Sequence, residues 1–282
     1  MWQRSYDGSP ILYLVPTPIG NMEDMTFRSA RILGEVDVIF SEDTRVTQNL
    51  LNYYKIKKKL VSLHDHNEDI VKEQVLNYLE NNKMVAVVTD RGTPIISDPG
   101  YKTVKYVSDR GYRVVALPGA CAFVPALITS GISPQPFTFY GFLDSRVEKK
   151  KKELEKLKFI PNSIIFYEAP HRILKTMKLI LEIFGNREVS LSREISKKFE
   201  SIYRGSIYDL LPTLESIKGE FVIVVAGFSD SMVEEEELDV IGQVDFYIEN
   251  GMAPMDAIKM VAKERNMKKN DVYREYHRGD RI

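Results

Sequence analysis

The feature that most constrains the fold is an alternation of short β-branched runs with helical patterns through the first 130 residues. The runs lie at residues 11–15, 36–40, 60–63, 84–89 and 113–117. Helical patterns, with apolar residues spaced at i, i+3 and i+4, lie between them at about 26–34, 44–54, 67–81 and 99–110. Such alternation predicts βαβ units and a mostly parallel sheet. Ligands of these sheets bind beyond the carboxyl ends of the strands, so we expect the binding residues in the loops that follow them.

The pattern changes after Ser130 and Gly131. Further strands are predicted at 134–142, 163–168, 188–194, 199–205 and 220–227, and helices at about 146–158, 170–184 and 206–217. Neighbouring strands without a helix between them indicate antiparallel pairing and therefore a mixed sheet. We place an N-terminal α/β domain at 1–131 and a second α/β domain at 132–229.

The last part of the chain is predicted to be helical and locally basic. The run of four glutamates in SDSMVEEEELDV (229–240) is typical of a solvated linker or a helix start. Helical patterns follow at about 238–249, 253–265 and 270–278, which gives a third domain at 238–282. Residues 251–282 contain eight Lys or Arg and five Asp or Glu, a net charge of +3. The turn RNMKKND between the last two patterns is compatible with a helix-turn-helix.

Composition excludes several classes of protein. The net charge of −1 provides no global field for nucleic acid, so any basic surface must be local. A single cysteine excludes a disulfide framework and a Cys-rich zinc site and fits a reducing cytoplasm. No stretch reaches the roughly 20 apolar residues that span a bilayer, and the start lacks the apolar segment of a signal peptide. We expect a cytoplasmic protein with no membrane partner.

The first strand runs into the loop LVPTPIGN (14–21), which starts like a phosphate-binding loop. Gly20 stands alone, whereas a P-loop or a dinucleotide-binding fingerprint needs several glycines at fixed spacing. Pro16 and Pro18 each remove a backbone donor that a phosphate would require. The loop therefore favours a ligand without phosphate, or a tight turn into a helix capped by Thr26.

Two more loops follow strands of the first domain. TDRGTPIISDPGY (89–101) is long and polar, which suits a ligand, although Asp98 and Pro99 also suit a helix cap and first turn. LPGACAF (117–123) offers small residues against which a flat ligand could lie. Cys121 has no histidine near it in sequence, which indicates a buried apolar cysteine instead of a nucleophile.

Charged clusters end or follow other strands. SEDTR (41–45) and YEAPHR (167–172) are candidate sites, while the charges of SREISKKFE (192–200) also suit a solvated strand end. HDHNE (64–68) contains two histidines without a partner set at standard ligand spacing, so no metal site is predicted. The lysine-rich runs at 55–59 and 148–158 are typical of solvated helix faces but could also contact phosphates.

Ten of these motifs together resemble the ribosomal RNA small-subunit methyltransferase I family, within the tetrapyrrole-methylase superfamily. In chain order they are TPIGN, SEDTR, HDHNE, TDRGTPIISDPGY, LPGACA, SGI, GFL, FYEAPHR, RG and GEFVIVVAG. The resemblance covers about 11–227, and the remaining chain is similar to that family's helical C-terminal domain. Their joint order makes the resemblance specific.

The resemblance implies a two-domain fold with S-adenosylmethionine folded into the cleft between the domains, and a homodimer. It implies 2′-O-methylation of a cytidine ribose of 16S rRNA at the decoding centre of the small ribosomal subunit, with RNA and not DNA as the partner. By position it places the cofactor contacts on Pro18, Gly20, Gly92, Thr93, Ile96, Cys121, Ala122, Tyr167 and Ala226.

Chemistry and loop position suggest the remaining roles. A 2′-hydroxyl is weakly acidic, so a base can accept its proton during attack. The candidates for this base or for positioning the ribose are Asp43, Glu168 and His171. The candidates for phosphate contacts are Arg45, Arg172 and Arg193, with Lys268 and Lys269 on the terminal helices as an RNA-docking arm.

Two residues depart from the family pattern and leave alternatives open. Arg91 replaces the usual alanine, and it could reach RNA phosphate or narrow the cofactor site. Cys121 replaces a small polar residue and is nearly isosteric with serine. The alternatives are C-methylation of a tetrapyrrole, the other chemistry of the superfamily, and an RNA-binding module without turnover.

Overall fold

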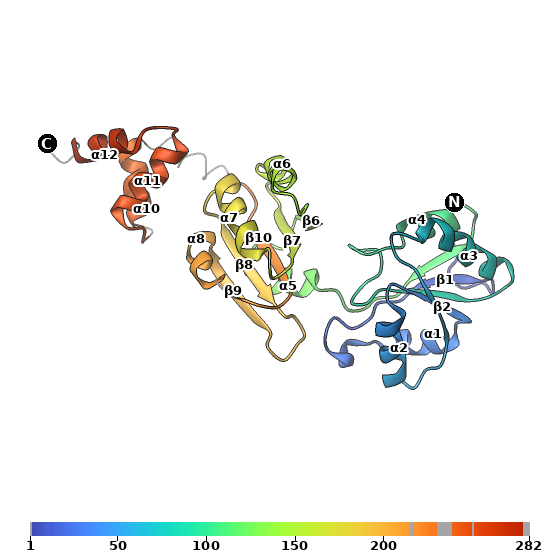
Figure 1. The fold of residues 1–282 in the computed structure, drawn as a ribbon. Coiled ribbons are helices and arrows are strands. Elements are labelled where there is room, and N and C mark those ends of the chain that lie inside the picture. Colours follow the sequence, from blue (N-terminus) through green and yellow to red (C-terminus); the bar gives the residue numbers. More distant parts are fainter. Residues whose placement is uncertain (1, 215–216, 230–238, 250, 279–282) are drawn as a thin grey trace. The chain divides into compact units, whose positions relative to one another are not determined.

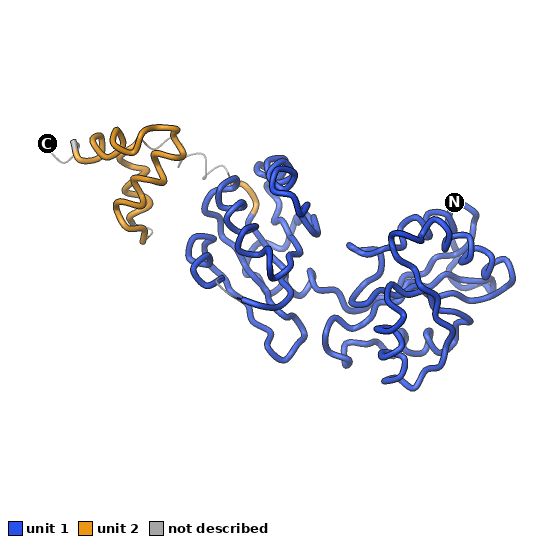
Figure 2. The backbone as a smooth tube through the Cα atoms, in the orientation of Figure 1, with its two compact units in different colours: residues 1–226 blue, residues 227–282 orange. Residues whose placement is uncertain are grey.

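The computed structural model describes residues 2–214, 217–229, 239–249 and 251–278. They form two compact units, residues 1–226 and residues 227–282 (Figure 2). The described residues form two sheets, both in the first unit, and the second unit is helical.

The first sheet is parallel throughout, as predicted. Its strands are ordered β3-β2-β4-β1-β5. Their bounds are β1 (Ile11–Leu14), β2 (Val38–Ser41), β3 (Lys59–Ser62), β4 (Val85–Val88) and β5 (Arg113–Ala116). The helices between them are α1 (Phe27–Glu35), α2 (Thr44–Tyr53), α3 (Glu68–Glu80) and α4 (Tyr101–Ser108).

Helices cover both faces of this sheet, with α1 and α2 on one face and α3 and α4 on the other (Figure 1). The central strand β4 is buried along its whole length. A strand with both faces covered must be apolar throughout, which explains its sequence VAVV. All five carboxyl ends therefore lie at one edge, where the connecting loops gather.

The second sheet is mixed, which confirms the sequence prediction. Its order is β6-β7-β10-β8-β9, with β6 parallel to β7 and the other pairs antiparallel. The bounds are β6 (Phe137–Phe142), β7 (Ser163–Glu168), β8 (Glu188–Arg193), β9 (Ser201–Ser206) and β10 (Phe221–Val225). One face packs against α6 (Val147–Leu157), α7 (Ile173–Phe184), α8 (Ile207–Leu210) and η2 (Leu211–Leu214), and the other against α5 (Phe123–Thr129).

Two helix starts were predicted from capping residues, and one of them is wrong. Thr26 caps α1 as predicted, with its Oγ1 accepting a hydrogen bond from Ser29 N at 3.0 Å. Asp98 does not cap α4, which begins at Tyr101 after Gly100 at φ 124°. The helix cannot start at Pro99 because Gly100, inside the predicted first turn, has a left-handed φ of 124°, which a helical turn cannot contain.

The second unit consists of α10 (Val240–Glu249), α11 (Pro254–Glu264) and α12 (Lys269–Arg278), so the predicted helical C-terminal region is present. Val244, Ile258, Val261 and Val272 are each at most 1% exposed and form its centre. The glutamates at 234–237 lie outside the described residues, and the helix-turn-helix remains a prediction. In no described helix do length and apolar character suffice to cross a membrane.

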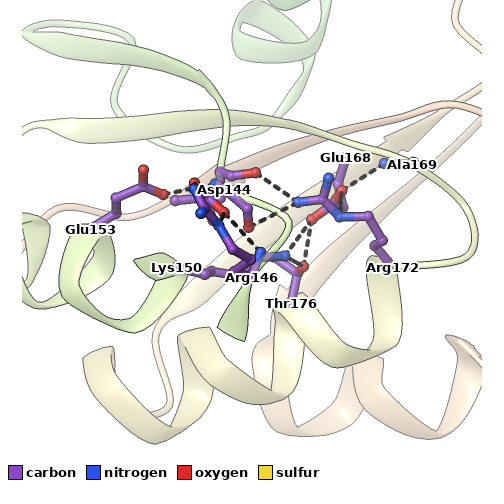
Figure 3. Close-up of polar contacts among 9 residues, drawn as sticks. Asp144, Arg146, Lys150, Glu153, Glu168, Ala169, Arg172 and Thr176 are labelled. Carbon is purple, nitrogen blue, oxygen red and sulfur yellow. Dashed lines mark hydrogen bonds and ion pairs between the residues drawn. The ribbon is translucent and has the colours of Figure 1, made fainter. Parts of the chain in front are cut away.

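A buried ion pair anchors β7 to the helical face of the second sheet (Figure 3). Alternation along β7 turns Phe166 and Glu168 towards α6 and α7, and Tyr167 towards the opposite face. Glu168 Oε2 lies 3.0 Å from Lys150 Nζ, and the two side chains are 0% and 4% exposed. The lysine-rich run was expected to be solvated or to contact phosphate, and for Lys150 that expectation is wrong.

Removing one partner of a buried ion pair leaves a buried charge without compensation, which costs several kcal/mol. We expect Lys150→Met to lower the free energy of unfolding by about 3 kcal/mol, because Glu168 would stay buried with less positive charge beside it. Urea denaturation measures this difference.

Lys152→Met is the matched control, because it makes the same change at an exposed position of the same helix. We expect it to change the free energy of unfolding by less than about 0.5 kcal/mol. Equal stability of the two variants would contradict a role for the buried pair.

Candidate functional site

Three loops meet at the carboxyl edge of the parallel sheet and are hydrogen-bonded to one another. Thr17 N donates to Gly92 O at 2.9 Å, and Gly92 N donates back to Thr17 O at 3.0 Å. Thr17 Oγ1 also donates to Thr89 O at 3.1 Å, and Thr93 Oγ1 donates to Ala120 O at 3.0 Å. The loops after β1, β4 and β5 therefore form one wall. The backbone N–H groups of Thr17 and Gly92 are therefore used inside the protein.

This wall faces a cavity of about 600 Å³ that is also lined by residues of the second sheet. Its size falls within the range of small-molecule sites in proteins. The lining combines carboxylates with apolar side chains. It consists of Ile19, Glu42, Val46, Thr89, Asp90, Arg91, Gly92, Thr93, Ile96, Ser97, Asp98, Cys121, Ala122, Phe142, Tyr167, Glu168, Ala169, Pro170, Ile195, Glu220, Phe221 and Val222.

Six of the residues expected to contact a cofactor line this cavity. They are Gly92, Thr93, Ile96, Cys121, Ala122 and Tyr167. They come from the loops after β4 and β5 and from β7, so the fold brings together positions up to 75 residues apart in sequence.

Three expected cofactor residues are not part of the lining. Pro18 is buried, and its neighbour Ile19 lines the cavity instead. Gly20 is exposed and lies close to Lys197, since a Cβ on Gly20 would be 2.4 Å from Lys197 Cγ. Ala226 packs on the α5 face of the second sheet, and its carbonyl accepts a hydrogen bond from Arg187 at 3.3 Å.

Three carboxylates lie at the carboxyl ends of β2 and β4 and line the cavity: Glu42, Asp90 and Asp98. Burial, reinforced by the charge of Glu42, raises the pKa of Asp98 to about 7. Burial is also the main cause that raises the pKa of Asp90. Glu42 Oε2 accepts a hydrogen bond from Thr89 Oγ1 at 2.8 Å.

Sequence reasoning missed Asp98 as a site residue because its position before Pro99 resembles a helix cap. The signal that could have identified it is the density of turn residues around it, which predicts an irregular loop at a strand's carboxyl end. A titratable group with a strongly shifted pKa in a cavity is a candidate functional residue.

Tyr167 lines the second-sheet side of the cavity. Burial is the main cause that raises the pKa of its hydroxyl, and the nearby Cys121 and Asp98 contribute to the shift. The hydroxyl therefore stays protonated at neutral pH and can donate a hydrogen bond. Cys121 lies beside Tyr167 and is half-buried.

The predicted catalytic Asp43 and the predicted RNA-binding Arg45 bind each other. Asp43 caps α2, with its Oδ1 accepting a hydrogen bond from Arg45 N at 2.8 Å, and it pairs with the Arg45 guanidinium at 2.6 Å. These hydrogen bonds lower the pKa of Asp43 to about 2, which makes it a weak base. Arg45 remains 88% exposed.

The arrangement does not support Glu168 as a base or Arg172 as an RNA contact. Besides Lys150, Glu168 contacts Thr176 and the backbone of Ala169 (Figure 3). Arg172 forms an ion pair with Glu168 at 3.2 Å and donates to the Leu143 carbonyl at 2.6 Å. Both side chains therefore fix β7 and the following turn.

The other predicted contacts lie elsewhere on the protein. His171 is exposed and is not part of the cavity lining. Arg193 donates to the Lys218 carbonyl at the end of β8. Lys268 and Lys269 are exposed at the start of α12 in the second unit.

Arg91 forms an ion pair with Glu220, and both residues lie at the cavity. Glu220 Oε2 also pairs with Lys197 Nζ at 2.8 Å, and Lys197 pairs with Glu194 at 3.0 Å. The Arg91 and Glu220 side chains are 54% and 58% exposed, so this link lies near solvent. The Arg91 guanidinium is thus directed to a carboxylate of the second sheet.

A second cavity, of about 420 Å³, adjoins the first. It is lined by Phe139, Tyr140 and Phe142 of β6 and by Ile95, Ile96 and Ser97 of the loop after β4. Ile96, Ser97 and Phe142 line both cavities. Aromatic side chains of this kind provide stacking surfaces for flat ligands.

The larger cavity suits a cationic nucleoside. Its carboxylates can balance a positive charge, and Ile19, Ile96 and Val222 can contact an apolar ring. Among the described residues, no group of three His, Cys, Asp or Glu could hold a metal.

Comparison with known proteins gives the family of the chain. The family profile described as Tetrapyrrole (Corrin/Porphyrin) Methylases matches residues 11–211. The protein named ribosomal RNA small subunit methyltransferase I of Bacillus subtilis (strain 168) is 47% identical over 285 residues, which is 98% of each chain. The protein of that name from Vibrio cholerae serotype O1 is 38% identical and covers 95% of this chain and 94% of its own.

Solved structures agree on the fold. Uroporphyrin-III-C-methyltransferase from Thermus thermophilus matches 77% of this chain and 94% of its own, with a TM-score of 0.56 and 18% identity. The structure of that enzyme complexed with S-adenyl homocysteine matches 76% of this chain and 96% of its own, with a TM-score of 0.56 and 16% identity. The chain therefore belongs to the tetrapyrrole methylase family and, within it, to the proteins named ribosomal RNA small subunit methyltransferase I.

Proposed function

We propose that the protein transfers a methyl group from S-adenosylmethionine to the 2′-hydroxyl of a cytidine in 16S rRNA, within the decoding centre of the small ribosomal subunit. The observation that carries this proposal is the cavity, whose wall of three hydrogen-bonded loops combines carboxylates with apolar contacts. The names of relatives that match the chain over almost its whole length support rRNA as the substrate.

The residues present fit the cofactor. Gly92, Thr93, Ile96, Cys121 and Ala122 would hold it against the loop wall, with Tyr167 on the opposite side. The bound cofactor supplies a methyl group that is already activated by its sulfonium centre. The chain's own contribution is to align the acceptor oxygen, and positioning of this kind can supply about 7 kcal/mol or more of the barrier.

The adjoining aromatic cavity suggests how the RNA is presented. Sequence-specific RNA recognition uses unpaired bases that stack on aromatic side chains. Phe139, Tyr140 and Phe142 would hold the base of the target nucleotide, while Ser97 and Ile96, which line both cavities, would lie beside its ribose. We place the protein in the cytoplasm, as a homodimer acting on the small subunit.

Labelled methyl transfer tests the function directly. We expect wild-type protein to label 30S subunits and the label to lie on a cytidine ribose, because the proposal requires a splayed nucleotide of the assembled decoding centre. Free 16S rRNA and a porphyrinogen are the comparison substrates. Labelling only of the porphyrinogen would favour tetrapyrrole C-methylation, and cofactor binding without any transfer would favour a binding module.

The effect of Arg91 can be measured by calorimetric titration with S-adenosylmethionine. We expect wild type to bind, because Glu220 holds the Arg91 guanidinium. We expect Arg91→Ala to change Kd by no more than about fivefold, since exposed ion pairs contribute about 1 kcal/mol or less. Binding by the variant but not by wild type would mean that Arg91 closes the cofactor site.

Lys268 and Lys269 are proposed to contact rRNA phosphates. We expect their double substitution by alanine to weaken binding to 30S subunits and to reduce the dependence of log K on log salt by about 1 to 2. S-adenosylmethionine affinity should not change. Lys259→Ala is the control, because Lys259 is already paired with Asp256 at 2.8 Å. Equal salt dependence of all three proteins would contradict the docking arm.

A further inference from the structure

Methylation of a hydroxyl requires that its proton be removed, and the acceptors expected from sequence are poorly suited. Asp43 has a pKa of about 2 and is paired with Arg45. The Glu168 carboxylate is fully buried and paired with Lys150. His171 is not part of the cavity lining. The acceptor has to be sought among the groups that line the cavity.

Asp98 lies where the two cavities meet. It lines the larger cavity, and its neighbour Ser97 lines both the larger one and the aromatic one. The loop that carries Asp98 is held in an uncommon conformation, with left-handed φ at the non-glycine residues Ile95 and Ser97. Strain of this kind costs about 1 to 3 kcal/mol per residue and occurs preferentially at functional sites.

The other carboxylates of the cavity already hold the protein together: Glu168 is paired with Lys150, Glu220 with Arg91 and Lys197, and Glu42 and Asp90 join the ends of two strands. Glu42 Oε2 accepts hydrogen bonds from Thr89 Oγ1 at 2.8 Å and from Asp90 N at 3.4 Å. Asp90 Oδ1 accepts a hydrogen bond from Asp43 N at 3.0 Å, which joins the ends of β2 and β4.

The chemical setting of Asp98 suits proton transfer near neutral pH. Burial is the largest cause of its raised pKa, and the charges of Glu42, Asp90 and Asp65 add to it, while the Thr89 hydroxyl opposes it. On the facing sheet, Tyr167 responds to the charge of Asp98 and keeps its own proton. A carboxyl whose pKa lies near the working pH is an efficient general base.

We propose that Asp98 is the catalytic residue that accepts the proton of the ribose 2′-hydroxyl during methyl transfer. This inference rests on the proposed function and identifies the base for that reaction. In the balanced step, the hydroxyl oxygen forms a bond to the methyl carbon and gives its proton to the Asp98 carboxylate. The carbon–sulfur bond breaks, and its electron pair remains on sulfur as a neutral thioether.

The test compares wild type with Asp98→Asn in methyl transfer to 30S subunits. We expect kcat to fall by about 100-fold or more, because general bases contribute factors of this size. The KM for subunits and the calorimetric Kd for S-adenosylmethionine should change by less than about threefold, since the substitution keeps the size of the side chain.

Two further variants give readouts that a structural role would not move. In wild type, the rate should rise with pH through about 7, where Asp98 becomes ionised. Glu42→Gln should shift this inflection to lower pH by removing a neighbouring negative charge. Glu73→Gln is the control, because Glu73 is exposed, lies outside the cavity lining and is not among the charges that act on Asp98, so its activity and pH profile should match those of wild type.

Folding of Asp98→Asn can be checked by the sign of its effect on stability. The raised pKa of Asp98 in the folded state means that wild type loses stability as pH rises from about 4 to about 7, because in this range the carboxyl is ionised in the unfolded chain and protonated in the folded one. Above about pH 7 the carboxyl is ionised in both states, and the loss is complete. At pH 8 the variant should therefore unfold at the same or a higher temperature than wild type. Carbon-13 NMR of labelled aspartates should lose one signal titrating near pH 7.

Each outcome either supports or overturns the role of Asp98 as the base. A large loss of kcat with unchanged cofactor Kd and a missing NMR titration supports the base. Transfer by Asp98→Asn within about tenfold of wild type would overturn it. A loss of S-adenosylmethionine affinity as large as the loss of kcat would also overturn the proposal, because it would mean that Asp98 binds the positive charge of the cofactor. If wild type labels no subunits, the proposed function fails and this inference fails with it.

Discussion

The pair of hydrogen bonds between Thr17 and Gly92 is the constraint on which the site depends. It joins the loops of the adjacent strands β1 and β4, and the Thr93 hydroxyl extends the connection to Ala120 after β5. Loops normally vary in conformation, but these satisfy one another's backbone groups and form a continuous wall. The wall and its surroundings offer apolar and acidic contacts to the cavity, and these suit a sulfonium nucleoside better than a phosphate because carboxylates repel a negative charge.

The second sheet contributes through the alternation of side chains along β7. Tyr167 reaches the cavity, and the next residue, Glu168, turns to the helical face and binds Lys150. One strand end therefore lines the cavity with one face and anchors the strand with the other. The anchored turn carries Ala169 and Pro170, which also line the cavity, so the buried pair stabilises part of its boundary.

Charge is distributed unevenly around the cavity, and this gives the carboxylates different roles. Asp43 is hydrogen-bonded to Arg45 and has a low pKa, whereas Asp98 is half-buried near other carboxylates and has a raised pKa. Asp43 follows β2 and Asp98 lies in the loop after the adjacent strand β4, yet the pKa values of the two carboxyls differ strongly. Environments that separate the pKa values of two similar groups are a common basis for assigning acid and base roles.

The sequence by itself determined the order and type of the elements, since period-2 and period-3.6 patterns report which faces are buried. It predicted the parallel and mixed sheets and the Thr26 cap, and its ordered motifs indicated the family. Only the tertiary structure decided which polar residues meet. Lys150 proved to be buried, Arg172 to be internal and Asp98 to face the cavity. These outcomes depend on contacts between residues distant in the chain, and no local pattern contains that information.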